Sequence, residues 1–260
     1  KDFINLRSPY SLHKDLDGLK THAKIIANIL SSSGIQINFA PVLDIKRFSD
    51  QHSIGDRTFG DDYQTVTQNT IPYFKEFEKN NVLAVVKHFP GHGATSINSH
   101  YFFPIIWNTN QLFKEDVIPF KEAIMVGHFI IPKFSGLVPS SLSWRTVQYL
   151  RDDLHFEKLI VTDDFQMGLF KFCNKAKVIK KAINSGFNLI LIKYYDRFFL
   201  DYNKLLNYQK KKKLNDDFVQ YSIQLIQNII NKYHITNELY PSTLDISKIN
   251  EQITQLNKRM

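Results

Sequence analysis

Residues whose side chains could do acid–base or nucleophilic chemistry follow short apolar runs of this chain. The clearest cases are a histidine-rich loop after the run 82–86 and two carboxylates after the run 159–162. The complete set is Asp44, Lys87, His88, His92, His100, His128, Asp163 and Asp164. In parallel α/β proteins, residues at the carboxyl ends of strands converge on the ligand-binding edge of the sheet. We therefore predict a functional site where these runs end.

The two adjacent carboxylates at 163 and 164 are the strongest part of this pattern. Burying carboxylates at the end of an apolar strand is costly unless they are hydrogen-bonded or functional. Asp164 can cap the segment that follows, since a helix N-cap accepts backbone N–H groups. Asp163 is then the carboxylate that we expect to face the site.

The loop after the run 82–86 reads Lys-His-Phe-Pro-Gly-His-Gly over residues 87–93. Its proline and glycines predict a compact turn that lets the backbone approach a ligand, and the loop then returns to His100. A metal-dependent hydrolase is an alternative, because histidine and aspartate are metal ligands. The spacing of these residues matches no metal motif, however, so we expect no metal ion at this edge.

Apolar strands alternate with amphipathic helices along the chain. The expected strands are 35–40, 82–88, 128–132, 159–162 and 188–193, and one of the expected helices is 116–125. This order predicts an α/β fold whose parallel sheet is covered by helices on both faces. No linker divides the chain, so we expect a single domain over 1–260 with a helical tail from about 208. A closed (β/α)8 barrel needs eight strands, so either strands escape the pattern or the barrel is incomplete.

Composition argues against several classes of function. The net charge is +8, but the one dense basic run, 210–213, has no interleaved aromatic residues, so we expect no nucleic-acid partner. No apolar run approaches the ~20 residues that span a bilayer, so no membrane segment is expected. The single cysteine, Cys173, excludes an internal disulfide and fits a reducing compartment such as the cytoplasm, which we expect; a periplasmic protein without disulfides would also fit.

Five segments, in this order, resemble the motifs of family 3 glycoside hydrolases, in particular the single-domain bacterial β-N-acetylglucosaminidases. Together they lie within about 15–195, and the loop 87–93 is the most specific of them. The segments are Asn38 to Asp44, Gly55 to Gly60, Lys87 to Gly93 with Asn98 to His100, Pro139 to Ser143, and Thr162 to Asp164 with Met167.

The resemblance implies a TIM-barrel-like (β/α)8 catalytic domain and a retaining exo-glycosidase that needs neither a metal nor an organic cofactor. Its substrate would carry terminal β-linked N-acetylglucosamine, as in peptidoglycan fragments during cell-wall recycling. In the family's pattern, Asp163 takes the position of the nucleophile and His100 that of the general acid/base. The residues at sugar-holding positions are Arg57, Lys87 and His88.

Two departures from the family's pattern favour an alternative, a catalytically weak or inactive relative that binds sugar. Asn98 stands where the family places the aspartate that orients the catalytic histidine, so we predict a lower pKa and weaker acidity for His100. The family's upstream strand also has no counterpart, so the expected barrel is incomplete at its N-terminus. A smaller departure, Asn188 in place of an aspartate, is expected to be structural.

Overall fold

A computed structural model of the chain describes residues 3–47, 54–92, 103–107, 122–193, 196–235 and 244–259. Two of the predicted catalytic residues, Asn98 and His100, lie outside these ranges.

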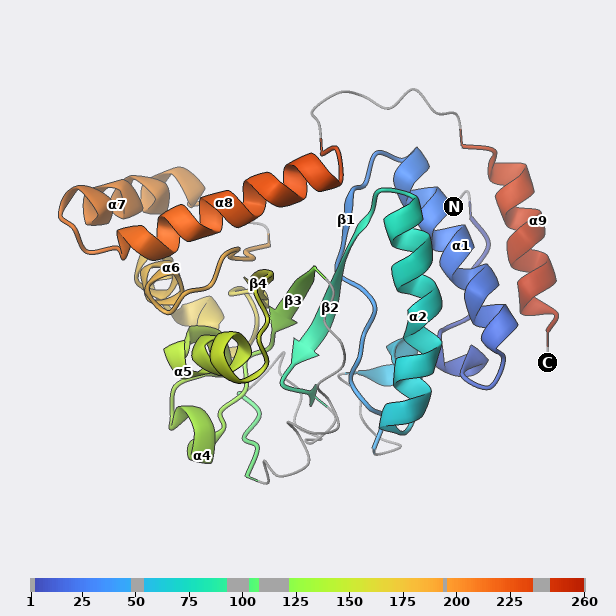
Figure 1. The fold of residues 1–260 in the computed structure, drawn as a ribbon, viewed down its shortest axis with the longest axis horizontal. Helices are drawn as coiled ribbons and strands as arrows, with labels where there is room; N and C mark the ends of the chain where they lie inside the picture. The colour runs from blue at the N-terminus through green and yellow to red at the C-terminus, as the bar shows by residue number, and fades with distance from the viewer. Residues whose placement is uncertain are drawn as a thin grey trace.

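Four parallel strands form the centre of the fold (Figure 1). They are β1 (Ile37–Asn38), β2 (Leu83–Phe89), β3 (Ala123–Val126) and β4 (Leu159–Thr162), hydrogen-bonded in that order. The segment after residue 187 extends the sheet beyond β4, because Leu189 forms a parallel bridge with Val161. Within the described residues the sheet does not close into a barrel, in agreement with the predicted incomplete (β/α)8 fold.

Both faces of the sheet are buried, which explains why its strands are apolar at successive positions. On one face, Ala84 and Val86 of β2 belong to a core with Phe74 and Phe77 of the helix that precedes this strand. On the other face, the intervening β2 residues pack in a second core that includes Ile229. A parallel sheet covered on two faces has this continuous apolar pattern rather than alternation.

Most of the longer helices begin at side chains that accept first-turn N–H groups. Asp15 accepts from the Gly18 N–H at 2.9 Å, and Asp62 accepts from the Thr65 N–H at 2.9 Å. Such N-caps satisfy donors that have no partner within the helix. The helices are α1 (Leu16–Ser32), α2 (Tyr63–Lys79), α4 (Pro132–Ser135), α5 (Trp144–Gln148), α6 (Lys175–Asn184), α7 (Phe198–Lys210), α8 (Asp216–Lys232) and α9 (Ile246–Asn257).

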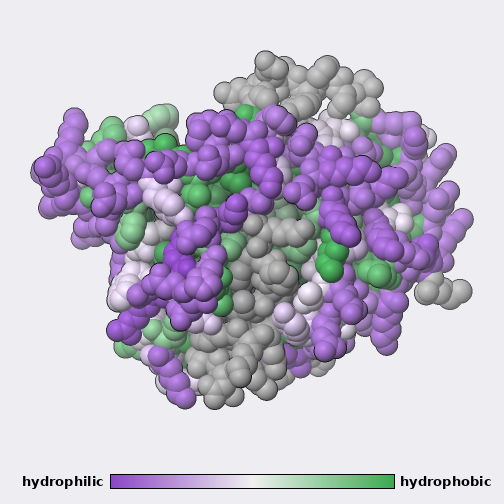
Figure 2. All heavy atoms as spheres, viewed as in Figure 1, coloured by the Kyte–Doolittle hydropathy of each residue, from purple (hydrophilic) through white to green (hydrophobic). Residues whose placement is uncertain are grey.

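The helices form two groups, with the sheet between them. Figure 1 shows α1, α2 and α9 side by side at one end of the molecule and α6, α7 and α8 together at the other. The surface over α8 and α2 is mainly hydrophilic in Figure 2, as expected for helices that bury one apolar face. Among the residues that the structure describes, no helix combines the length and the apolar character needed to cross a bilayer.

One pair of predicted elements is wrong. A helix was expected over 116–125 and a strand over 128–132. In the described part of the first range, 122–125, the chain instead enters β3, which occupies Ala123–Val126. All four β3 side chains are buried between β2 and β4, so the sheet's need for a central strand overrides the local helical pattern. Residue Ile130 instead forms an isolated parallel bridge with Ile105.

Candidate active site

The carboxyl ends of β2 and β4 bring three of the predicted site residues to one edge of the sheet. Lys87 and His88 lie near the carboxyl end of β2, and Asp163 directly follows β4. The Nε2 atom of His88 lies 4.0 Å from Oδ2 of Asp163. Arg57 is exposed at the end of the short 3-10 helix Gly55–Arg57, and its charge acts on Lys87.

A register shift explains how consecutive residues of β2 serve the same edge. Lys87 pairs with Met125 of β3 and Phe89 pairs with Val126, which leaves His88 as the extra residue of a bulge. Bulges redirect a side chain and end regular pairing, and they occur often beside functional sites. Here the bulge allows both Lys87 and His88 to lie near Asp163.

Asp44, which follows β1, fixes the position of His88. Its Oδ2 atom lies 2.6 Å from Nδ1 of His88, and its Oδ1 accepts the backbone N–H of His92 at 2.6 Å. The Asp44 side chain is fully buried, so these contacts take the place of water. Burial raises the pKa of Asp44, but the charge and hydrogen bond of His88 outweigh it, and the pKa lies below its usual value. Asp44, His88 and Asp163 therefore form a buried chain of alternating acid and imidazole groups.

Asp163 is an ionised carboxylate at neutral pH. Burial raises the pKa of Asp163, but the nearby charges of His88 and His128 have the larger combined effect and lower it. One oxygen of Asp163 accepts the backbone N–H of Asp164 at 2.8 Å. A carboxylate that is buried yet ionised is suited to attack an electrophilic carbon.

Lys87 is half-buried beside Asp163. Burial lowers the pKa of Lys87 and the Arg57 charge lowers it further, while the carboxylates of Asp163 and Asp44 oppose both effects. Lys87 and Arg57 therefore supply hydrogen-bond donors at the open side of the carboxylate cluster, where a polar ligand would be held.

The remaining histidines of the described edge support the site structurally. His128 is buried, its Nε2 donates to the carbonyl of Asp164 at 3.0 Å, and its Nδ1 lies 2.7 Å from the Ser141 hydroxyl. Burial lowers the pKa of His92 to about 4, so its ring is neutral. The described residues contain no group of three or more histidine, cysteine, aspartate or glutamate side chains placed to hold a metal ion.

Asp164 accepts backbone N–H groups as expected, but it is not the predicted helix cap, because the next helix, Gly168–Phe172, has Met167 as its N-cap. Its Oδ1 accepts the N–H groups of Gln166 at 2.9 Å and of Lys193 at 3.0 Å. These bonds tie the segment after β4 to the neighbouring segment that follows Leu189. They also leave Asp163 as the carboxylate next to His88.

Sequence reasoning placed Asp44 at this edge but gave it no role in the site. The available signal was a carboxylate that directly follows two buried apolar residues, Val42 and Leu43. That signal could not show that the partner of Asp44 is His88, 44 positions later. Asn98 and His100 lie outside the described residues, so their roles stay predictions.

Residues 10–229 match the Glycosyl hydrolase family 3 N terminal domain. The chain belongs to this family. It is 28% identical over 211 residues to Beta-hexosaminidase A of Pseudoalteromonas piscicida, which covers 73% of this chain and 35% of that protein. It is 39% identical over 125 residues to Beta-hexosaminidase LpqI of Mycobacterium tuberculosis, which covers 45% of this chain and 32% of that protein.

A solved family 3 structure has the same fold. The structure of a glycoside hydrolase family 3 β-N-acetylglucosaminidase from Paenibacillus sp. FPU-7 has a TM-score of 0.87 and 24% identity to this chain. The match covers 98% of this chain and 52% of that one. The chain therefore spans about a third of the length of each of these two relatives and about half of this structural neighbour.

Proposed function

We propose that this chain carries the catalytic edge of a retaining exo-glycosidase that removes terminal β-linked N-acetylglucosamine. The observation that supports this most is the buried, ionised Asp163 beside a histidine that Asp44 holds in place. Two relatives bear the name beta-hexosaminidase, which favours an N-acetylated hexose as the substrate.

In the proposed reaction, the Asp163 carboxylate attacks the anomeric carbon and forms an ester bond as the glycosidic C–O bond breaks. His100 donates a proton to the departing oxygen. His100 then removes a proton from water, and that water displaces Asp163 from the anomeric carbon and restores both groups. Two displacements at one carbon return the original β configuration.

Arg57, Lys87 and His88 are proposed to bind the hydroxyl groups of the sugar. Lys87 and Arg57 are both fixed donors, and donors that carry charge form the stronger hydrogen bonds to hydroxyl oxygens. The natural substrate is proposed to be a peptidoglycan fragment with N-acetylglucosamine at its non-reducing end.

The direct test is release of nitrophenol from nitrophenyl β-N-acetylglucosaminide by the chain and by an Asp163→Ala variant. The proposal predicts release by the chain and loss of nearly all of it in the variant. A peptidoglycan disaccharide tested in parallel examines the natural substrate. Release that is equal in the chain and the variant would contradict the assignment of Asp163.

A second candidate, a sugar-binding relative with little activity, is favoured by Asn98. An asparagine cannot stabilise the imidazolium of His100 as an aspartate does, and in the serine-protease triad the analogous change costs ~10⁴ in rate. This candidate predicts that a folded chain binds N-acetylglucosamine without releasing nitrophenol. An Asn98→Asp variant would then raise the rate of release.

A further inference from the structure

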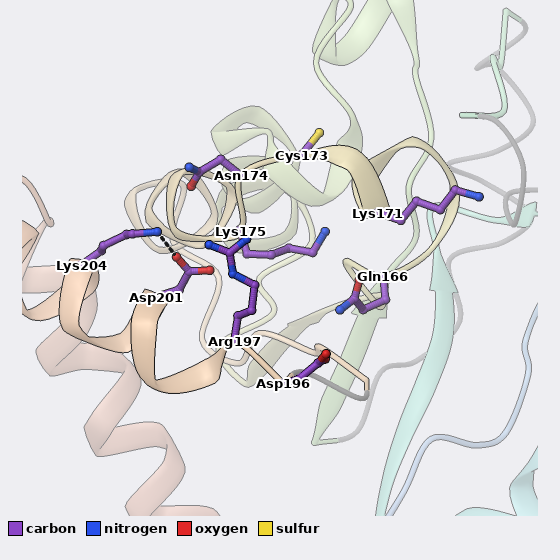
Figure 3. Close-up of a pocket in the computed structure, with 9 residues that line it drawn as sticks. All are labelled: Gln166, Lys171, Cys173, Asn174, Lys175, Asp196, Arg197, Asp201 and Lys204. Atoms are coloured by element: carbon purple, nitrogen blue, oxygen red, sulfur yellow. Dashed lines mark hydrogen bonds and ion pairs between the residues drawn. The ribbon is translucent and has the colours of Figure 1, made fainter.

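A second cavity lies between two segments of the chain, residues 166–175 after β4 and residues 196–204 at the beginning of α7. Its volume is about 200 Å³, and its charged lining residues are Lys171, Lys175, Asp196, Arg197, Asp201 and Lys204. We name it the α6–α7 pocket, because these residues lie on α6, on α7 or in the segments that directly precede them (Figure 3). The residues assigned to the active site above are not among its lining residues.

Positive charge predominates among the described lining residues. Lys204 and Asp201 neutralise each other through an ion pair of 2.7 Å. Three basic side chains, Lys171, Lys175 and Arg197, then share the pocket with the single carboxylate of Asp196. Figure 3 shows Lys175 and Arg197 close together, with Lys171 further away and its side chain directed outward. The local charge therefore favours an anionic ligand.

Lys175 is the most informative of these residues, because it is only 6% exposed. Its ammonium donates to the carbonyl of Phe170, and it forms no ion pair with a carboxylate of the described residues. Burial lowers the pKa of Lys175, as expected for a charge that is incompletely compensated. A buried ammonium that borders a cavity is stabilised by an anion that enters the cavity.

The beginnings of two helices add to the attraction for an anion. Lys175 is the first residue of α6, and Arg197 is the N-cap of α7. No side chain of the described residues caps α7, and its N-cap residue Arg197 lines the pocket. Free N–H groups and the positive end of the helix dipole both bind oxyanions.

We propose that the α6–α7 pocket binds an oxyanion, a phosphate or carboxylate group, carried on a small molecule. A volume of about 200 Å³ corresponds to several water molecules at ~30 Å³ each, so it exceeds one such group. It is also smaller than the ~300 Å³ at which sites for drug-sized ligands begin. The buried Lys175 and the exposed Arg197 hold the anionic group, and the rest of the molecule extends toward Gln166. This site does not depend on the proposed glycosidase activity.

Calorimetric titration of the whole chain with inorganic phosphate, lactate and glucose 6-phosphate tests the proposal without any enzyme assay. The expected result is saturable binding of at least one of these anions, about tenfold or more weaker in Arg197→Gln and in Lys175→Met. Lys177→Gln is the matched control, because Lys177 is an exposed lysine of the same helix that does not line the pocket. Binding by this control should equal that of the unaltered chain.

The anions also separate two sources of the ligand. Equal affinity for phosphate and glucose 6-phosphate assigns the pocket to a free ion, and tighter binding of the sugar ester assigns it to a sugar-borne anion. A Lys87→Gln variant separates this pocket from the active site. The proposal would be overturned if Lys87→Gln weakened anion binding while Arg197→Gln left it unchanged. It would also be overturned if Lys177→Gln weakened binding as much as the pocket variants do, or if none of the anions bound.

Discussion

At the scale of single residues, a buried carboxylate and a histidine hold each other in place beside Asp163. Asp44 accepts from His88 and from the backbone of His92, so one side chain fixes both the ring and the turn that follows it. His88 in turn lies between Asp44 and Asp163. The position of His88, the histidine nearest the proposed nucleophile, thus depends on the fully buried side chain of Asp44.

An Asp44→Asn variant tests this positioning role. We expect kcat to fall by about 10²–10⁴, because a neutral amide holds the His88 ring less strongly than the carboxylate does. KM should change much less, and the pH profile of kcat should shift. Asp56→Asn is the matched control, since Asp56 is an exposed carboxylate paired with Lys46 at 3.0 Å. A folded Asp44→Asn variant with unchanged kcat and pH profile would show that Asp44 is merely structural.

Asn188 stands where the family's pattern has an aspartate, and its contacts are structural, as predicted. Its Oδ1 accepts the Ile160 N–H at 2.8 Å, and its Nδ2 donates to the Ser222 hydroxyl at 3.0 Å. Asn188→Ala leaves the buried Ile160 N–H without a partner, so we expect a loss of about 1–3 kcal/mol in unfolding free energy. Urea unfolding measures this. Asn203→Ala, at an exposed position, should change it by less than about 0.5 kcal/mol.

At the scale of elements, the interface between α1 and α2 contains a buried histidine, His22, that is paired with a tyrosine. His22 of α1 contacts the hydroxyl of Tyr73 on α2 and the carbonyl of Arg7. Burial lowers the pKa of His22 to about 4, an effect that the Arg7 carbonyl partly opposes. His22 is therefore neutral in the folded protein at pH 5 to 6, where an exposed histidine gains a proton.

This packing predicts a pH dependence of stability. Because the folded pKa of His22 lies below its unfolded value of 6.5, the unfolded chain binds more protons between about pH 4 and 6.5. Unfolding free energy should therefore fall as the pH falls through that window. His22→Gln should reduce the fall by at most about 3 kcal/mol. Urea unfolding at several pH values measures it, and an equal slope in the variant would contradict the assignment.

His155→Asn is the control for that measurement, because His155 is exposed and asparagine tolerates its φ of 50°.

The buried carboxylates affect stability in a different, more acidic pH range. Asp44 and Asp163 have folded pKa values below 3.8, so the stability they provide is present above that pH. It is lost as the pH falls through their folded pKa values.

Some elements and contacts can be predicted from the sequence and others cannot. Strand β4 and the edge carboxylates follow directly from an apolar run that ends in aspartates, because burial on both faces and the end of the strand are both local signals. Strand β3 does not, because its four residues also fit the end of a helix. Their state is decided by β2 and β4, which lie far away in the sequence. The pairing of Asp44 with His88 is also a contact between elements, and no local pattern contains it.

At the scale of the whole molecule, the C-terminal helix α9 packs against the N-terminal region. Ile249, Ile253 and Leu256 of α9 are buried in the same core as residues of α1. Arg259 and Asp15 join the two segments through contacts of 2.7 Å and 3.1 Å. The end of the chain therefore stabilises the helix layer that covers β2.

An Ile253→Ala variant tests whether α9 is part of the cooperative fold. The side chain is 1% exposed, so its truncation leaves a cavity and should lower the unfolding free energy by about 2–5 kcal/mol. Ile246→Ala in the same helix, where the side chain is 37% exposed, should cost clearly less. Denaturant unfolding followed by circular dichroism compares them. Equal costs would mean that α9 does not dock as described.

The measurement that tests the central claim most directly is the identity of the residue that bonds to the sugar. A β-N-acetylglucosaminyl fluoride with a second fluorine at ring carbon 5 slows breakdown of a glycosyl-enzyme intermediate and lets it accumulate. After proteolysis, mass spectrometry should find the added sugar on the peptide that contains Asp163, and Asp163→Ala should form no adduct. An adduct on another residue, or turnover of the substrate by the variant at the rate of the unaltered chain, would contradict the account.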